Sequence, residues 1–331
     1  MATLALSLAL TFNERTRPLI ERQVQPEGIE LAITVCEPGE LFWRQLKAAE
    51  FDASEMSLSS LLQLVARGDT RWWGLPIFTM RQFFHTGILV RTDAGIACPQ
   101  DLRGKRVGVP EYQQTAALWV RGVLQHEFGV APTEMVWYME RAPDQSHAAG
   151  TGFQPPPGLE LHYIPPQRSI AEMLLAGDLD AAAFYIPQRT LLDRSGVDLR
   201  GHPRVRPLFP DAAAESARYY RQTGLFPINH GMVVRRTIVD QYPWVPLNLY
   251  QAFERARERF EAQGRAFVTP YVQAGLLPAP TAGALDQTLY PYGVAANRRV
   301  LETIARYAHE QGLTPRVVAL DELFAPSTLA T

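Results

Sequence analysis

Cysteine is almost absent from this sequence, which has two cysteines in 331 residues. Cys36 and Cys98 lie far apart, and neither belongs to a CxxC or CxH pair of the kind found in metal and redox sites. We therefore expect two reduced thiols and no disulfide bond.

Short motifs for metals and phosphates are also missing. The sequence has no HxH or HExxH spacing, no Walker loop, no GxGxxG loop and no GxSxG turn. We therefore expect no metal and no organic cofactor. A metal site assembled from residues far apart in the sequence stays open.

The chain has neither a strong charge nor a long apolar run. Its formal net charge at pH 7 is −2, so nothing points to nucleic acid or an acidic membrane surface as a partner. The apolar run Leu4–Leu10 is far shorter than the roughly 20 residues of a membrane span. No Lys or Arg precedes it, unlike the start of a secretory signal. We expect a buried strand in a cytoplasmic protein with no membrane contact.

Alternating strand and helix patterns fill the chain. Strands are predicted at Leu4–Leu10, Ile29–Val35, Trp72–Phe78, Arg106–Val109 and Ala181–Tyr185, and helices at 14–24, Gly39–Ala48, Leu58–Ala66, Pro243–Gln263 and Asn297–Gln311, with a further helix opening at Gln114–Thr115. Such alternation favours parallel strands joined by right-handed crossovers.

Two stretches, Gly87–Arg91 and Phe226–Val234, are predicted to carry the chain between two lobes. Residues 1–92 and 225–331 would form lobe 1, and residues 93–224 would form lobe 2. A ligand cleft would lie at the crossovers, and hinge closure would shut it. The segment Ala142–Gly158 is rich in Pro and Gly and is expected to be a surface loop.

Motifs along nearly the whole chain resemble one family. They include Ser54-Glu-Met-Ser57, Pro76-Ile-Phe-x-x-Arg81 with His85, Leu102-Arg-Gly-Lys-Arg-Val-Gly-Val-Pro-Glu111 with Gln114-Thr115, Glu172-Met-Leu-Leu-Ala-Gly-Asp-Leu-Asp-Ala181 and Thr223-Gly-x-Phe-Pro-Ile-x-His230. On these motifs the chain resembles the 4,5-dihydroxyphthalate decarboxylases, relatives of the type II periplasmic binding proteins. The resemblance implies a two-lobed α/β fold of periplasmic-binding-protein type II-like architecture, with mixed sheets flanked by helices and a cleft between the lobes.

The resemblance also implies a reaction. It would be the non-oxidative loss of carbon dioxide from 4,5-dihydroxyphthalate, a small aromatic dicarboxylate, to give 3,4-dihydroxybenzoate. A ring hydroxyl para to the departing carboxylate pushes electrons to the ipso carbon, which takes a proton before carbon dioxide leaves. The protein must supply a cationic clamp for the carboxylates, a base near the hydroxyl and an acid near the ipso carbon.

Histidine is the natural acid–base group near neutral pH. His85 and His230 fall at the two crossings between lobes, and we predict that both are catalytic, leaving open which one donates the proton. Glu55 is predicted to be catalytic as well, because it ends a strand where open α/β sheets place their ligands. The other histidines, including His147, are expected to face solvent.

The predicted substrate-binding residues fall into three chemical groups. Arginines pair with carboxylates in a bidentate manner, helix openings offer backbone N–H groups to anions, and aromatic rings wall the substrate. The residues are Arg81, Arg168 and Arg17 for the carboxylates, Ser57, Gln114 and Thr115 at helix openings, Tyr185 beside the ring and Asn229 next to His230.

Other interpretations of this scaffold remain. The chain could be a non-catalytic solute-binding protein for an aromatic carboxylate, or another lyase resembling the menaquinone-pathway enzymes that dehydrate chorismate. A thiamine-pyrimidine synthase would carry a cysteine-rich metal segment, which this sequence lacks. The apolar faces of the C-terminal helices and the segment Tyr242–Trp244 suggest a homo-oligomer of undetermined order.

Overall fold

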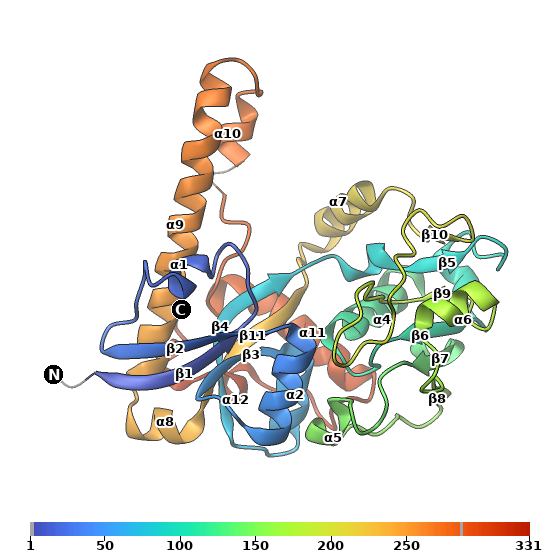
Figure 1. The fold of residues 1–331 in the computed structure, drawn as a ribbon, viewed down its shortest axis with the longest axis horizontal. Helices are drawn as coiled ribbons and strands as arrows, with labels where there is room; N and C mark the ends of the chain where they lie inside the picture. The colour runs from blue at the N-terminus through green and yellow to red at the C-terminus, as the bar shows by residue number, and fades with distance from the viewer. Residues whose placement is uncertain (1–2, 285–286) are drawn as a thin grey trace.

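The computed structural model describes residues 3–284 and 287–331, and two mixed β-sheets form its framework (Figure 1). The first sheet has the strand order β2-β1-β3-β11-β4. Its strands are β1 (Leu4–Leu10), β2 (Ile29–Val35), β3 (Ala53–Ser57), β4 (Trp72–Arg81) and β11 (Ile228–Arg235). β1 pairs in parallel with β2 and β3, whereas β11 lies between β3 and β4 and is antiparallel to both.

The second sheet has the strand order β10-β5-β9-β6-β7-β8. Its strands are β5 (Leu89–Arg91), β6 (Arg106–Val109), β7 (Val136–Met139), β8 (Leu161–Tyr163), β9 (Ala181–Ala182) and β10 (Val205–Pro207). β9, β6, β7 and β8 run parallel, and β5 is antiparallel to both of its neighbours. The predicted fold class, with mixed sheets flanked by helices, is confirmed.

Helices cover both sheets. The α-helices are α1 (Arg17–Ile20), α2 (Pro38–Ala48), α3 (Leu58–Ala66), α4 (Thr115–Phe128), α5 (Ala148–Thr151), α6 (Ile170–Ala176), α7 (Ala212–Thr223), α8 (Arg236–Gln241), α9 (Val245–Gln273), α10 (Pro280–Ala284), α11 (Arg298–Glu310) and α12 (Leu320–Leu323). Short 3₁₀ turns are η1 (Phe84–Gly87), η2 (Pro99–Leu102), η3 (Pro132–Glu134), η4 (Ala295–Asn297) and η5 (Pro326–Thr328). No helix of the described chain is long and apolar enough to cross a membrane.

Three predicted elements have different lengths in the structure. The helix expected over 14–24 is only the single turn α1, because Arg22 adopts a left-handed φ of 58° that a helix cannot continue through. The strand predicted at Ala181–Tyr185 ends at Ala182. The helix expected to end at Gln263 continues through Gly264 to Gln273.

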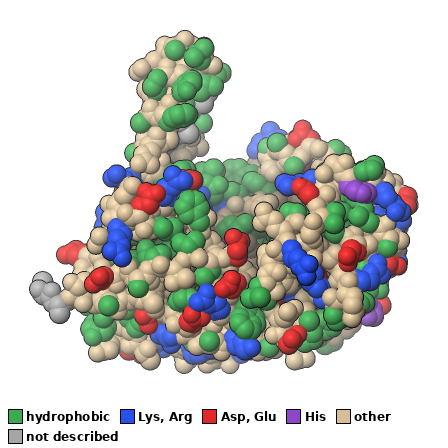
Figure 2. Space-filling model, in the orientation of Figure 1, with side chains coloured by type: hydrophobic (Ala, Val, Ile, Leu, Met, Phe, Trp, Pro, Cys, Tyr) green, Lys and Arg blue, Asp and Glu red, His purple; other side chains and the backbone are tan. Residues whose placement is uncertain are grey.

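The second half of α9 leaves the body of the protein. Figure 1 shows α9 and α10 rising together as an arm, and Figure 2 shows apolar side chains on its surface. Phe267 is 69% exposed and Leu276 is 71% exposed. The buried residues of α9 all lie at or before Arg257.

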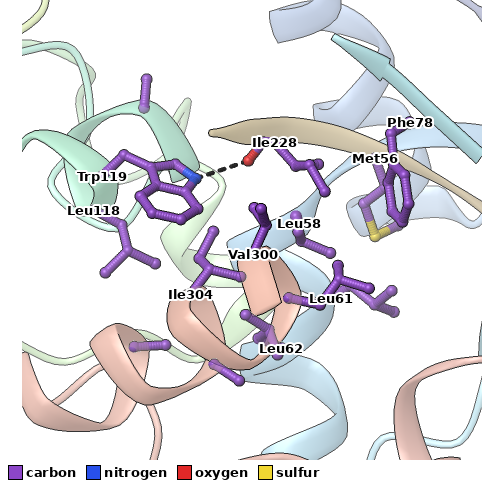
Figure 3. Packing of buried hydrophobic residues seen from close by; sticks show 14 of the residues in the cluster. Met56, Leu58, Leu61, Leu62, Phe78, Leu118, Trp119, Ile228, Val300 and Ile304 are labelled. Carbon is purple, nitrogen blue, oxygen red and sulfur yellow. Dashed lines mark hydrogen bonds between the residues drawn. The ribbon is translucent and has the colours of Figure 1, made fainter. Parts of the chain in front are cut away.

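One buried core continues beneath both sheets. Trp119 of α4 is almost fully buried and donates a hydrogen bond of 2.8 Å from its indole nitrogen to the carbonyl oxygen of Ile228 in β11 (Figure 3). Val300 and Ile304 of α11 lie beside this pair in the same core cluster. The helix that follows the second sheet's central strand is therefore anchored to the first sheet.

The residue limits of the two lobes stay a prediction. The strand pairing indicates that the first crossing comes slightly before residue 92, because β5 at Leu89–Arg91 already belongs to the second sheet. The return crossing leads from α7 into β11, near the predicted limit at residue 224.

Candidate active site

The site lies where the carboxyl ends of parallel strands in the two sheets face each other. β1, β3 and β4 all run in the same direction, opposite to β11, so their ends gather at one edge together with the start of β11. The carboxyl ends of β6, β7 and β9 likewise gather at one edge of the second sheet, because these strands are parallel. Ligands of open α/β sheets bind at such edges, where loops are free to turn inward.

A cavity of about 220 Å³ occupies this position. Its first-lobe wall includes Phe42, Ser57, Met80, Asn229 and His230, and its second-lobe wall includes Gln114, Thr115, Arg141, His147, Phe184 and Asp193. Of the predicted residues, the structure brings His230, Asn229, Ser57, Gln114 and Thr115 together around this one space.

The strongest polar contact of the cavity joins His230 to Glu55. His230 Nδ1 donates to Glu55 Oε1 at 2.6 Å, and the other carboxylate oxygen accepts from the backbone N–H and the hydroxyl of Thr11 at 2.9 and 2.7 Å. Glu55 itself is completely buried behind His230. Burial opposes its negative charge, but the hydrogen bonds from His230 and Thr11 outweigh this effect and hold the pKa of Glu55 below its ordinary value.

The opposite ring nitrogen of His230 is bonded to a neighbouring side chain. The Asn229 amide donates to His230 Nε2 at 2.8 Å, and both residues line the cavity. Phe42 of α2 packs edge-on against the imidazole, with ring centroids 4.8 Å apart. A histidine held on one nitrogen by a buried carboxylate presents its other nitrogen as a proton acceptor or donor.

The second-lobe wall carries a buried ionic cluster. Arg141 donates to both carboxylate oxygens of Asp193 at 2.8 and 2.9 Å, and also to Glu111 at 3.3 Å. Burial opposes the guanidinium charge, but Glu111 and Asp193 outweigh burial and raise the pKa of Arg141 above its ordinary value. Because its charge is already matched by two carboxylates, Arg141 is a poor partner for a further anion.

His147 lines the cavity and contacts residues of both walls. Its Nε2 donates to the carbonyl oxygen of Gly39 at 3.1 Å, and its Nδ1 lies 3.4 Å from Glu111. Burial lowers the pKa of His147, although Glu111 partly opposes this. The expectation that His147 faces solvent is wrong, because His147 is buried and lines the cavity. The segment Ala142–Gly158 is a surface loop only in part: its end at 154–158 is largely exposed, but Ser146, Thr151 and Phe153 are buried.

Two helix openings meet across the cavity. The hydroxyl of Thr115, at the start of α4, accepts a 2.9 Å hydrogen bond from the backbone N–H of Ser59 in α3. The Ser57 and Thr115 hydroxyls lie 2.8 Å apart. Ser57 therefore does not cap its own helix, and a residue of the other lobe satisfies the first turn of α3 instead. The amide nitrogen of Gln114 is buried and has no hydrogen-bond partner in the described chain.

Arg81 lies beside this cavity rather than in it. It lines an adjoining cavity of about 850 Å³, together with Thr11, Arg15 and Met80. Met80 also lines the first cavity, so the two spaces share a wall.

Apart from Glu55, which lies behind His230, four predicted site residues lie outside both cavities. His85 pairs with Glu215 at 3.1 Å, Tyr185 donates its hydroxyl to the Val197 carbonyl, Arg168 pairs with Asp178 at 2.6 Å and Arg17 pairs with Glu14 at 2.7 Å. His85 is enclosed by Phe83, Phe209 and Tyr219, and burial lowers its pKa to about 4. Arg17 is an exposed surface residue, and Arg168 is partly exposed. Their predicted roles are corrected accordingly.

Arg141, His147, Asp193 and Phe42 were missed by the sequence reasoning. A usable signal existed for two of them. Arg141 and His147 follow β7, which ends at Met139, and the carboxyl end of a parallel strand is where ligand-binding residues are expected.

Within residues 3–284 and 287–331, no group of three or more His, Cys, Asp or Glu side chains is arranged to hold a metal ion. The expectation that no cofactor is needed stays a prediction.

Comparison with known proteins identifies the family. The 4,5-dihydroxyphthalate decarboxylase of Comamonas testosteroni is 36% identical over 334 residues, which cover 99% of this chain and 98% of the relative. The chain belongs to the 4,5-dihydroxyphthalate decarboxylase family. A second member, from Pseudomonas putida, is 33% identical over 221 residues, or 67% of this chain and 83% of the relative. The resemblance predicted from the motifs is confirmed.

Wider similarity is structural. A family model described as NMT1/THI5 like matches residues 25–137 of this decarboxylase-family chain. The periplasmic aliphatic sulphonate-binding protein SsuA of Escherichia coli superposes with a TM-score of 0.53 at 15% identity, covering 98% of this chain and 92% of that protein. At that identity the likeness shows the shared fold alone.

Proposed function

We propose that this chain is a non-oxidative carboxy-lyase that converts 4,5-dihydroxyphthalate to 3,4-dihydroxybenzoate and carbon dioxide. The observation that carries the proposal is the pair formed by His230 and the buried Glu55 at the edge of the cavity between the two sheets. A full-length relative named for this reaction supports the choice of substrate.

The chemistry of the substrate defines what the cavity must do. In 4,5-dihydroxyphthalate each carboxylate has a hydroxyl para to it. Removal of that hydroxyl proton sends electron density to the ipso carbon, which takes a proton and becomes tetrahedral. The bond to the carboxylate then breaks, its electrons return to the ring, and carbon dioxide leaves. One group must donate at the ipso carbon and another must accept at the hydroxyl.

His230 fits the donor role. Its Nδ1 is committed to Glu55, which leaves Nε2, now bonded to the cavity residue Asn229, as the nitrogen available to a substrate. The anionic Glu55 stabilises the imidazolium that donates the proton, and it holds the neutral ring in one tautomer afterwards. Glu55 is thus a positioning residue, and substrate replaces the Asn229 amide at Nε2.

The hydroxyl end of the ring would face the second lobe. Asp193 lines the cavity there and is held by Arg141 and by the hydroxyl of Thr190. A carboxylate fixed in this way accepts hydrogen bonds from a catechol and draws off the proton of the para hydroxyl. The reacting carboxylate then lies at the first-lobe wall, beside His230.

A solute-binding role is the second candidate, because the sulphonate-binding protein has the same fold. Both functions need the cavity, but only a decarboxylase needs an acid–base pair that is buried behind it. Turnover separates the two functions.

The test mixes purified protein with 4,5-dihydroxyphthalate, with and without a chelator, and follows carbon dioxide and 3,4-dihydroxybenzoate. Product at equal rates in both samples supports acid–base chemistry by the residues above. If product forms only without the chelator, the proposed reaction stands and a metal takes part in it. A rise in melting temperature without product supports the binding role. If the protein shows neither product nor a rise in melting temperature, the phthalate assignment is wrong.

We also propose that the chain forms a homo-oligomer through the arm of α9 and α10. No residue of α9 after Arg257 is buried, and the arm exposes Phe267 and Leu276 to solvent. A second copy of the chain would cover these apolar side chains.

A further inference from the structure

Two arginines in the adjoining cavity have no acidic partner. Arg15 and Arg81 both line it, and neither forms an ion pair with any carboxylate of residues 3–284 or 287–331. Arg44 lines the same cavity but differs, because it pairs with Glu40 at 3.1 Å and with Glu50 at 2.5 Å. Two unmatched guanidinium groups on one wall are the usual recognition element for a carboxylate.

Arg81 is fixed in place by uncharged groups. It is 8% exposed, and it donates to the carbonyl oxygen of Pro291 at 2.7 Å, to the carbonyl of Phe226 at 3.4 Å and to the side chain of Asn297. Its Nε has no hydrogen-bond partner in the described chain. Burial is the main reason that the pKa of Arg81 is lowered to about 10; Tyr292 opposes this shift, and the nearby charge of Arg15 adds to it. The site therefore holds a charged group at neutral pH that an anion would stabilise.

Arg15 supplies the second guanidinium. It donates to the Thr79 carbonyl oxygen at 2.5 Å and lies over the ring of Tyr290, 3.9 Å from its centroid. Stacking on an aromatic ring orients the planar group and leaves its edge available for hydrogen bonds. Its Nε is also buried without a hydrogen-bond partner among the described residues.

This pair lies close to the proposed proton donor. Thr11, which lines the adjoining cavity, donates to Glu55, and Met80 lines both cavities and pairs with His230 across β4 and β11. A group bound at Arg15 and Arg81 is therefore next to a ring carbon that faces His230. The two carboxylates of a phthalate are on adjacent ring carbons, so one can lie at each place.

We propose that Arg15 and Arg81 form the subsite for the carboxylate that the substrate keeps. This inference rests on the proposed function for the identity of the substrate. The two arginines anchor the retained carboxylate and so direct the neighbouring carboxylate, the one that departs, towards His230. Ligands with an aromatic carboxylate bind there, whereas a catechol without a carboxylate gains nothing from it.

Binding without turnover tests the subsite. Calorimetry would measure the affinity of the protein for two ligands. Phthalate has both carboxylates but no hydroxyls, and catechol has only the hydroxyls. In Arg15→Gln, phthalate affinity should fall about 10-fold or more, as expected for loss of a charge-assisted hydrogen bond. Catechol affinity should stay within about twofold. Arg15→Lys should recover part of the loss.

Arg17→Gln is the matched control, because Arg17 is two residues away, exposed and paired with Glu14. It should leave both affinities unchanged. Arg81→Gln should weaken phthalate binding in the same manner. If the Arg81→Gln variant does not fold, the result for Arg15→Gln alone decides whether the subsite exists. Unchanged phthalate affinity in Arg15→Gln, an equal loss for catechol, or no phthalate binding by the unmodified protein would each overturn the subsite.

Failure of the subsite and failure of the proposed function give different results. If the protein binds phthalate through Arg15 but releases no carbon dioxide, the proposed activity is wrong and the subsite stands. If the protein releases carbon dioxide and the Arg15→Gln variant binds and reacts normally, the activity stands and the subsite is wrong.

Discussion

Three hydrogen bonds converge on the Glu55 carboxylate inside the protein. They come from His230 and from the backbone and hydroxyl of Thr11. A buried carboxylate without such donors would take up a proton, and it would then no longer stabilise a positive imidazole. Thr11 therefore contributes to the acid–base pair although it does not face the first cavity.

His230→Gln should lower kcat on 4,5-dihydroxyphthalate by about 10²- to 10⁴-fold, the usual contribution of a general acid. Glu55→Gln should also lower kcat, because the neutral amide does not stabilise the imidazolium. KM should change little in both variants, because neither residue is proposed to bind the carboxylates. Steady-state kinetics measures the split between kcat and KM.

His162→Gln is a suitable control, since His162 is exposed, bonds to Glu160 and lies in neither cavity. Its kinetics should match those of the unmodified protein. Normal kcat in His230→Gln, in a variant with an unchanged melting temperature, would remove His230 from the mechanism.

His85 has a structural role that predicts how stability depends on pH. Burial lowers its pKa from 6.5 to about 4, so the folded protein resists a proton that the unfolded chain accepts below pH 6.5. Stability should therefore fall as the pH drops from 7 towards 5, with about 2 kcal/mol of the loss coming from His85.

Urea unfolding at pH 7 and pH 5 measures this effect. His85→Gln cannot take up the proton, so the difference in unfolding free energy between the two pH values should shrink by about 2 kcal/mol. His162→Gln should leave that difference unchanged. An equal difference in His85→Gln and the unmodified protein would show that other groups cause the acid sensitivity.

Of the individual site residues, the sequence predicted some and missed others for a physical reason. His230, Asn229, Ser57 and Thr115 belong to strand ends and helix openings, which local patterns reveal. Arg141 contacts Glu111 and Asp193, which are 30 and 52 residues away along the chain. Such contacts have no local pattern, because only the folded lobe brings the three segments together.

Among the elements, α4 is the one that ties the two lobes together. Its first turn satisfies the start of α3, its Trp119 bonds to β11, and Gly122 lies against α11. The sequence predicted where α4 begins from the strand and loop before it. The partners of α4 could not be predicted, because they depend on which helix face meets which neighbour after folding.

Gly122→Ala should destabilise the protein although alanine favours helices. A Cβ at Gly122 would lie 2.1 Å from Cδ2 of Tyr307. That ring stacks on His126 at 4.7 Å and packs edge-on against Trp119 at 5.7 Å, so it has little room to move. We expect a loss of about 1–3 kcal/mol in unfolding free energy, as for other overpacked cores.

Gly264→Ala in α9 is the matched control for that change. A Cβ there meets no atom within 4 Å, so only the helix preference of alanine remains. Urea unfolding should show a gain of about 0.5–1 kcal/mol for this variant. A stabilised Gly122→Ala variant would mean that Tyr307 shifts freely and that the contact between α4 and α11 is loose.

Across the whole molecule, the double crossing between sheets was predicted from the order of strand and helix patterns, and the fold class from the family resemblance. The shared core beneath both sheets and the projecting arm were not. The amphipathic pattern of α9 predicted a packed helix, and it is packed only through Arg257. A helix pattern cannot tell whether the surface that covers it comes from the same chain.

The arm supports the last prediction, which concerns assembly. The part of α9 beyond Arg257 extends roughly 24 Å at 1.5 Å per residue. Phe267 on this part and Leu276 just after the end of α9 are both exposed. Because exposed apolar side chains of this size are unfavourable in water, we expect a second copy of the chain to bury them.

The double variant Phe267→Glu, Leu276→Glu should shift the mass measured by light scattering from an oligomer to the 37.1 kDa monomer. Val317→Glu, which adds a charge at an exposed residue outside the arm, should leave the mass unchanged. An unmodified protein that is monomeric, or a double variant that stays oligomeric, would show that the arm does not hold the assembly together.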